Sequence, residues 1–325
     1  MRYATIGTSW ITESFISAAK TVPGITLAAS YSRDEQRAAA FAAKNGAEKF
    51  YTDLEKLAAD PEIDSVYIAS PNRFHYEQSR KMLLTGKNVL CEKPAATTEE
   101  QIRELIALAE ERGLIYSEAI MSIHTPAFTA VKDALGRIGE VRSAHIDYCQ
   151  LSSKYPAYLA GKNPNIFNPE MHAGCLMDIG VYNLYLAAAL FGMPEKIYSS
   201  AVFLDSGADS NGAAIFVYPS LNVSLTYSKT GQNYAPSEII GDTGTIGIQA
   251  VSQLTGCRLI TKTGEELLAA DDISRDEVMS GEAAYFKRMT DTKEYSDPEY
   301  IFSKNTALTV RQMCDIIRKQ NGFPF

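Results

Sequence analysis

The sequence is poor in cysteine and has no long block of basic residues. Its five cysteines are an odd number, stand far apart and include no C-x-x-C pair. A disulfide framework and a structural zinc site are therefore not expected, and a reducing compartment fits better. Lys and Arg total 31 against 39 Asp and Glu, a net charge of −8, which argues against a nucleic-acid-binding protein.

Signals for export and for membrane insertion are also missing. Residues 1–7 lack the long apolar stretch of a signal peptide. The most apolar helical stretch, residues 181–191, is shorter than the ~20 residues that a bilayer requires. We therefore expect a soluble, cytoplasmic protein that binds neither membrane nor nucleic acid.

An ordinary globular composition accompanies these absences. Hydrophobic residues make up 46% of the chain and charged residues 22%, which excludes a disordered protein. Its 325 residues suggest two domains, at roughly 150 residues each. Composition alone indicates no chemistry, so function has to be sought in the order of strands, helices and motifs.

The first part of the chain alternates short apolar runs with amphipathic segments, which is the βαβ pattern. Strands are expected at residues 3–6, 26–31, 65–69, 88–91 and 114–117. Helices are expected at residues 10–20, 34–45, 76–85 and 98–113. This alternation predicts a doubly wound parallel sheet, a dinucleotide-binding Rossmann domain over residues 1–120. Ligands of such sheets bind at the carboxyl ends of the strands.

The pattern changes in residues 121–325. Candidate strands with turns between them are residues 141–151, 197–203, 213–218, 222–228, 238–241, 245–249 and 258–261. Helices are expected at residues 127–135, 177–191 and 302–319. Consecutive strands predict a large, open, mostly antiparallel sheet in an α+β domain over these residues. The junction is expected near residues 118–126.

A reduced phosphate-binding loop follows the first expected strand. Its residues are Gly7-Thr8-Ser9-Trp10-Ile11-Thr12. Of the dinucleotide fingerprint G-x-G-x-x-G only Gly7 remains, but Ser9 is small enough to let the backbone approach a pyrophosphate. The helix that starts here offers unpaired N–H groups to that phosphate. A simple strand-to-helix turn explains the loop equally well.

The residues after the second expected strand bear on the choice of cofactor. They are Ser32 and two arginines four positions apart, Arg33 and Arg37. If both lie in a first helical turn they share a face, where two guanidinium groups suit the 2′-phosphate of NADP. Asp34 keeps NAD open as the cofactor, since an acid there can bind the ribose. Alternatively, Asp34 or Glu35 pairs with the arginines on an exposed helix start.

Two further motifs carry candidate catalytic groups. Lys93 follows the expected strand at residues 88–91, so it faces the ligand edge of the sheet, and Pro94 restricts it to extended geometry. In the second half, Asp178 and Tyr182 are four residues apart on an expected helix and face one way. Gly174 and Gly180 would let that helix approach another group closely. A capped core helix with an ordinary Tyr is the alternative.

Together these motifs resemble the Gfo/Idh/MocA oxidoreductase family over nearly the whole chain. The motifs are Glu92-Lys93-Pro94, Ser70-Pro71-Asn72 with His75, Glu118-Ala119, and Gly174…Asp178-Ile179-Gly180…Tyr182. The chain is most similar to the branch of dimeric dihydrodiol dehydrogenases and NADP-dependent xylose dehydrogenases, which also has Tyr at the position of Tyr182 and an Arg pair. The chain departs from the family in its reduced glycine loop and in residues 120–124, which lack the aromatic and Arg residues often found there.

The resemblance implies hydride transfer between a nicotinamide cofactor, NADP or NAD, and a sugar, polyol or vicinal-diol carbon. Tyr182 would be the acid or base, with its pKa lowered by positive charge from Lys93 and the oxidised cofactor. Lys93 would also hold the reacting oxygen, and Asp178 would orient Lys93 or bind a neighbouring hydroxyl. The residues implied on the nicotinamide-ribose side are Asn72, His75, Glu92 and Glu118.

Four further expectations follow. The fold also permits an NAD-dependent glycosidase that oxidises its substrate transiently, although relatives of that kind carry His rather than Tyr at the position of Tyr182. A non-catalytic NADP-binding sensor is the third possible function. A metal is not expected, because Asp178 and His172 have no third ligand at recognisable spacing. The open second sheet implies a homodimer or homotetramer that pairs through its uncovered face.

Overall fold

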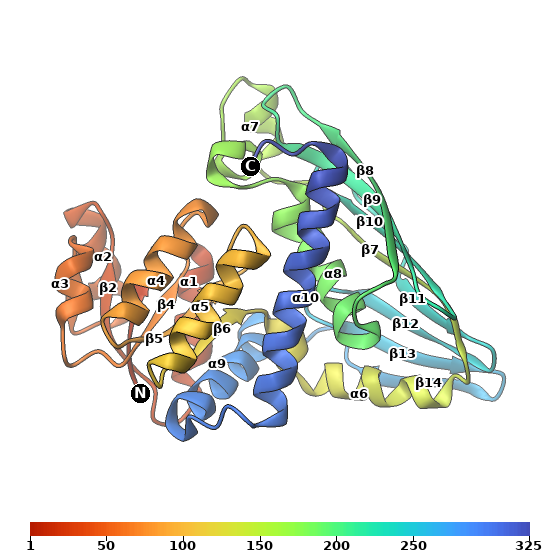
Figure 1. The fold of residues 1–325 in the computed structure, drawn as a ribbon, viewed down its shortest axis with the longest axis horizontal. Coiled ribbons are helices and arrows are strands. Elements are labelled where there is room, and N and C mark those ends of the chain that lie inside the picture. Colours follow the sequence, from red (N-terminus) through yellow and green to blue (C-terminus); the bar gives the residue numbers. More distant parts are fainter. The chain divides into compact units, whose positions relative to one another are not determined.

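The structure is a computed structural model that describes residues 1–325 and divides into two compact units (Figure 1). The first unit comprises Met1–Met121 together with Ser274–Asn305. The second comprises Ser122–Ile273 and Thr306–Phe325. Residues 274–305, which the sequence pattern left in the second domain, thus pack with the nucleotide-binding half.

A six-stranded parallel sheet in the order β3-β2-β1-β4-β5-β6 forms the centre of the first unit. Its strands are β1 (Arg2–Ile6), β2 (Thr26–Tyr31), β3 (Lys49–Tyr51), β4 (Ser65–Ile68), β5 (Asn88–Glu92) and β6 (Tyr116–Ala119). The unit's helices are α1 (Trp10–Lys20), α2 (Glu35–Asn45), α3 (Leu54–Ala59), α4 (His75–Leu84), α5 (Glu99–Glu111) and α9 (Arg275–Thr292). The predicted Rossmann sheet is confirmed.

Local sequence signals explain where these elements begin and end. Every residue of β4 and β5 is buried, as expected for parallel strands covered on both faces. Thr98 and Gln101 form a capping box at the start of α5. Gly46 ends α2 in the left-handed conformation, with φ 78°. The last strand is shifted from the predicted residues 114–117 and includes Glu118.

Helix α9 is an addition that the periodicity of the sequence did not predict. It packs against α1 within the first unit. Ser274 caps it by accepting a hydrogen bond from the backbone N–H of Glu277, so a short capping signal is present in the sequence. Its buried stripe contains Glu282, a charged residue that interrupts the apolar pattern by which amphipathic helices are recognised.

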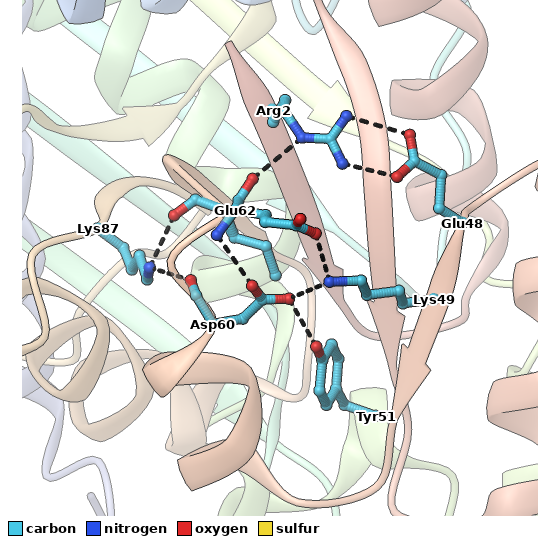
Figure 2. A network of polar contacts seen from close by, with 8 residues as sticks. Arg2, Glu48, Lys49, Tyr51, Asp60, Glu62 and Lys87 are labelled. Carbon is cyan, nitrogen blue, oxygen red and sulfur yellow. Dashed lines mark hydrogen bonds and ion pairs between the residues drawn. The ribbon is translucent and has the colours of Figure 1, made fainter.

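A polar network stabilises the first unit near the amino end of its sheet (Figure 2). Arg2 forms an ion pair with Glu48 at 2.6 Å, and Lys49 forms one with Asp60 at 3.0 Å. The hydroxyl of Tyr51 donates to the same Asp60 carboxylate at 2.6 Å. This hydrogen bond is the main reason that the pKa of Asp60 falls to about 2. The network lies away from the carboxyl ends of the strands, where ligands bind.

The second unit is built on an eight-stranded sheet in the order β14-β13-β12-β11-β7-β10-β9-β8. Its strands are β7 (Val141–Cys149), β8 (Lys196–Phe203), β9 (Asp209–Val217), β10 (Asn222–Ser228), β11 (Ser237–Gly241), β12 (Gly244–Ala250), β13 (Thr255–Thr261) and β14 (Gly264–Ala269). Only β7 and β10 pair in parallel, so the prediction of a mostly antiparallel sheet is confirmed.

Four helices accompany this second sheet. They are α6 (Pro126–Ala134), α7 (Tyr155–Leu159), α8 (Val181–Phe191) and α10 (Pro298–Asn321), which begins in the first unit and ends in the second. Helix α8 packs on β7 and β10, while α6 lies along β13 and β14 (Figure 1).

One segment is longer and more apolar than the sequence prediction allowed. Pro169–Phe191 spans 23 residues, and its most apolar 18-residue part has a mean hydropathy of 1.4, enough in length and composition to cross a membrane. The estimate based on residues 181–191 alone was too short, because helical turns precede α8. However, 83% of the most apolar part is buried inside the protein, as in a core helix.

Candidate functional site

The loop after β1 has the backbone that a phosphate site requires. Gly7 has φ 119°, and a Cβ there would lie 2.5 Å from the carbonyl oxygen of Ala69, so a larger residue does not fit. Ser9 precedes α1 with extended geometry, yet its side chain makes no capping hydrogen bond to the helix. Its hydroxyl instead lies 3.3 Å from that of Thr12. The first N–H groups of α1 are therefore left for an anion.

At the end of β2, the structure corrects the prediction that Arg33 and Arg37 share a helical face. It still supports the prediction that both side chains can bind a phosphate. Arg33 precedes α2 and only Arg37 lies in its first turn, so the two do not share a helical face. Asp34 is the N-cap, and its carboxylate accepts from the Arg37 backbone N–H at 2.7 Å. No ion pair joins a carboxylate to either arginine side chain. Since Asp34 is used as a cap, both exposed guanidinium groups are available to a phosphate. Ser32 completes the turn, with its hydroxyl accepting from the Asp34 N–H at 3.4 Å.

Contacts with residues near the ends of β4, β5 and β6 hold the turn that carries Lys93 in place. Lys93 is half-buried and is joined to Pro94 by a cis peptide bond. The His75 ring contacts the Pro94 carbonyl oxygen at 2.9 Å and, through its other nitrogen, the Ser70 carbonyl oxygen at 2.6 Å. The buried Glu118 carboxylate accepts from the Ala95 N–H at 2.9 Å. The ends of β4, β5 and β6 are thus linked around the lysine.

His75 is enclosed between the loops that follow β4 and β5. It is 1% exposed, and both ring nitrogens face backbone carbonyl oxygens. Burial lowers the pKa of His75, while the hydrogen bonds to the two carbonyl oxygens oppose this shift. We assign His75 to positioning the loops that follow β4 and β5. Ser70, Pro71 and Asn72 form the segment at the carboxyl end of β4. The Ser70 hydroxyl donates to Gln78 at 2.7 Å.

Glu92 is also buried, at 9% exposure, and it belongs to an acidic pair. The Tyr67 hydroxyl donates to its carboxylate at 2.5 Å, and the Tyr67 ring stacks on Phe15 at 3.8 Å. Burial raises the pKa of Glu92, while the charge of Lys93 opposes this shift. Glu282 from α9 is its acidic neighbour, and neither oxygen of Glu282 has a hydrogen-bond partner. These two carboxyl groups are a feature that the motifs did not indicate.

Arg275, the first residue of α9, reaches the phosphate loop. Its guanidinium lies 5.2 Å from the ring centre of Trp10, which is the first residue of α1 and is 64% exposed. Its Nη1 is 4.0 Å from the Met121 sulfur. No sequence motif marked this arginine, because 265 positions separate it from Trp10 and only folding of α9 onto α1 brings the two together.

In the second unit, Asp178 has an ion-pair partner that the sequence did not indicate. The Lys229 ammonium donates to its carboxylate at 2.6 Å, and the Lys229 side chain is 9% exposed. Asp178 lies in a π-helical turn, Leu176–Gly180, that leads into α8. Such turns often occur at functional sites. Tyr182 follows in α8 at 9% exposure, with its ring edge-on to Tyr148 at 5.9 Å.

The two glycines of this motif allow the close approach that was predicted for them. A Cβ at Gly174 would lie 2.0 Å from a carboxylate oxygen of Asp209, and one at Gly180 would lie 3.0 Å from the Tyr227 ring. Asp209 accepts from the Leu176 N–H at 2.7 Å and thereby anchors the turn that bears Asp178. Burial raises the pKa of Asp209 to about 7.

Comparison with known proteins identifies the family. Residues 1–120 match the model described as an oxidoreductase family with an NAD-binding Rossmann fold. Residues 130–247 match the GFO/IDH/MocA C-terminal domain. The chain belongs to the Gfo/Idh/MocA oxidoreductase family. The predicted resemblance is confirmed, as is the prediction of an NAD(P)-dependent oxidoreductase.

Relatives and solved structures share this architecture. The scyllo-inositol 2-dehydrogenase (NADP(+)) IolU of Bacillus subtilis is 37% identical over 326 residues, covering 100% of this chain and 98% of the relative. Human trans-1,2-dihydrobenzene-1,2-diol dehydrogenase is 30% identical over 257 residues, 76% of this chain and 73% of the relative. The crystal structure of KijD10, a 3-ketoreductase from Actinomadura kijaniata, in complex with NADP and TDP-benzene has a TM-score of 0.84. At 24% identity over 99% of this chain and 98% of that one, it shows the shared fold.

Proposed function

We propose that this enzyme is an NADP-dependent dehydrogenase or reductase of a sugar or cyclic polyol. Its likeness to the scyllo-inositol 2-dehydrogenase extends over the whole chain, which supports a ring carbon bearing a hydroxyl as the reacting centre. The observation that supports NADP over NAD is the capping role of Asp34. This acid is held by the Arg37 N–H, whereas no carboxylate neutralises the side chain of Arg33 or Arg37.

The residues present fit a dinucleotide. Gly7 leaves room where a Cβ would collide with Ala69, and the N–H groups at the start of α1 are free of side-chain caps. When bound, the nicotinamide ring accepts the hydride from the alcohol carbon or returns it to a ketone. The protein has to hold the substrate oxygen and exchange the hydroxyl proton.

We assign the proton exchange to the hydroxyl of Tyr182. In oxidation the phenolate form of Tyr182 takes the proton of the substrate hydroxyl as the C–H electron pair leaves with the hydride, and in reduction its phenol form returns a proton to the carbonyl oxygen. The Lys93 ammonium donates a hydrogen bond to that oxygen, and its turn is held by His75 and Glu118. Asp178, kept in place by Lys229, accepts from a neighbouring substrate hydroxyl.

Turnover with a panel of inositols, aldoses and trans-dihydrodiols tests this function. We expect NADPH to form from NADP with at least one cyclic polyol or sugar, followed at the absorbance band of NADPH. Cofactor binding without turnover across the panel would favour a non-catalytic sensor. Release of an aglycone from glycosides without net NADPH would favour a glycosidase.

Cofactor choice is tested by the double substitution Arg33→Ala and Arg37→Ala. Each guanidinium can make charge-assisted hydrogen bonds to the 2′-phosphate, so we expect KM for NADP to rise roughly a hundredfold or more. KM for NAD should change little, because NAD lacks that phosphate. The matched control is Arg112→Ala, another exposed arginine of the same unit, whose Nη1 bonds the Leu84 carbonyl oxygen. Equal losses for both cofactors would contradict the preference for NADP.

We also propose a cytoplasmic homodimer. Five free cysteines, four of them buried, fit a reducing compartment.

On the uncovered face of the second sheet, Tyr198 and its cross-strand partner Ile215 are 58% and 50% exposed, and Val202 is 54% exposed. Light scattering at micromolar concentration should give twice the chain mass, and Tyr198→Glu with Ile215→Glu should give monomers. A wild-type monomer would refute the proposal.

A further inference from the structure

Two arginines from different loops meet at one aromatic ring. The guanidinium carbon of Arg33 lies 5.8 Å from the centre of the Phe74 ring, and that of Arg73 lies 5.3 Å from it. Arg33 belongs to the loop between β2 and α2. Arg73 and Phe74 lie in the short 3-10 turn Asn72–Phe74 after β4. The sequence motifs drew attention to Arg33 but not to Arg73 or Phe74.

Each of these arginines places a positive charge against the Phe74 ring. Both arginines are exposed, and neither forms an ion pair with a carboxylate. The aromatic face attracts and orients each guanidinium but leaves its charge in place. Each is a planar group with several N–H donors, suited to a doubly charged phosphate, which bidentate hydrogen bonds can hold.

The topology places the pair at the adenosine end of a dinucleotide. Strands β2 and β4 flank β1 on either side, so the loops that follow them lie at the same edge of the sheet as the phosphate loop. The contact of Gly7 with Ala69 shows that the β1 loop and the end of β4 touch. The loop after β2 is where the adenosine ribose binds in folds of this type.

We propose that Arg73 is a further ligand of the adenosine 2′-phosphate and that Phe74 is the platform that holds Arg33 and Arg73 for it. The preference for NADP then depends on two loops, those after β2 and after β4. This inference rests on the proposed use of NADP and names a specificity-determining residue for it. The site would take a 2′-phosphorylated adenosine and discriminate against one with a free 2′-hydroxyl.

Calorimetric titration of the intact protein with 2′,5′-ADP and with 5′-AMP tests the inference without requiring turnover. We expect Arg73→Ala to weaken 2′,5′-ADP binding by roughly tenfold to a hundredfold and to change 5′-AMP binding by less than about twofold. Arg73→Lys should restore part of the loss, because a point charge replaces the fork. Phe74→Leu should act in the same direction as Arg73→Ala by releasing both arginines. Arg112→Ala is the control and should change neither affinity.

The possible results separate this inference from the proposed function. If the wild type binds both probes equally, the preference for NADP fails and the inference fails with it. If the wild type prefers 2′,5′-ADP and Arg73→Ala keeps that preference, only the role of Arg73 is overturned. Equal weakening of both probes by Arg73→Ala would also overturn it, since the arginine would then bind a part that the probes share. Unfolding midpoints in urea show whether each variant is folded.

Discussion

Replacing Lys93 with methionine should lower kcat by roughly a thousandfold or more, while the dissociation constant of NADP changes by less than about tenfold. Methionine keeps an unbranched chain of similar length but cannot donate a hydrogen bond to the reacting oxygen. The turn should keep its shape, because His75 contacts the Pro94 carbonyl and Glu118 accepts from the Ala95 N–H, neither of which involves the ammonium. Stopped-flow measurement of hydride transfer, with NADP binding followed separately by fluorescence, checks both halves of this prediction.

The control for this variant is Lys56→Met, which removes an exposed lysine from α3 of the same unit. It should leave both kcat and NADP binding unchanged. A Lys93→Met enzyme with full activity on a true substrate would remove Lys93 from the reaction. A variant that loses NADP binding as severely as kcat would instead give Lys93 a role in holding the cofactor.

The sequence was most informative where function follows from the order of strands. β4 and β5 are buried on both faces, so each contains a continuous apolar run in the sequence. Such runs, and the residues at which they end, could be recognised from the local sequence alone. Lys93 follows β5 directly, and its place at the ligand edge follows from the parallel order alone. The glycine requirement at Gly7 is likewise local in origin, although the Ala69 carbonyl that enforces it became visible only in the structure.

Partners that are distant in sequence could not be predicted in this way. Lys229 is 51 positions from Asp178, and nothing in either segment indicates that they pair. Arg275 reaches Trp10 only because α9 folds back onto the first unit. The i, i+4 argument for Arg33 and Arg37 failed because Asp34, as the N-cap, starts α2 one residue after Arg33. Local periodicity assigns residues to elements, whereas these contacts depend on how the elements pack.

Replacing Glu282 with glutamine should stabilise the protein by an amount that grows as the pH rises. Glu282 is 1% exposed, and neither of its carboxylate oxygens has a hydrogen-bond partner. Burial, followed by the nearby Glu92 carboxylate, raises the pKa of Glu282 well above its usual range, although the charge of Arg275 opposes this. The folded protein therefore keeps this carboxyl protonated at pH values where the unfolded chain has released the proton.

The sign of the effect follows from proton linkage. Below the unfolded-state pKa of about 4.3, both states hold the proton and the group adds no pH dependence. Above it the unfolded chain binds fewer protons, so this group lowers the stability of the folded state by about 1.4 kcal/mol per pH unit until the folded-state pKa is passed. Glutamine resembles the protonated acid in shape but does not titrate, so it removes this loss.

Urea unfolding at pH 5, 7 and 9 measures the difference. The advantage of Glu282→Gln over the wild type should grow between pH 5 and pH 7. A fixed cost of burying the amide would cancel in this comparison, because it is the same at each pH. Glu277→Gln, which removes an exposed carboxylate from the same helix, is the control for charge loss on α9. A stability difference between Glu282→Gln and the wild type that stays constant from pH 5 to pH 9 would mean that Glu282 is ionised in the folded protein.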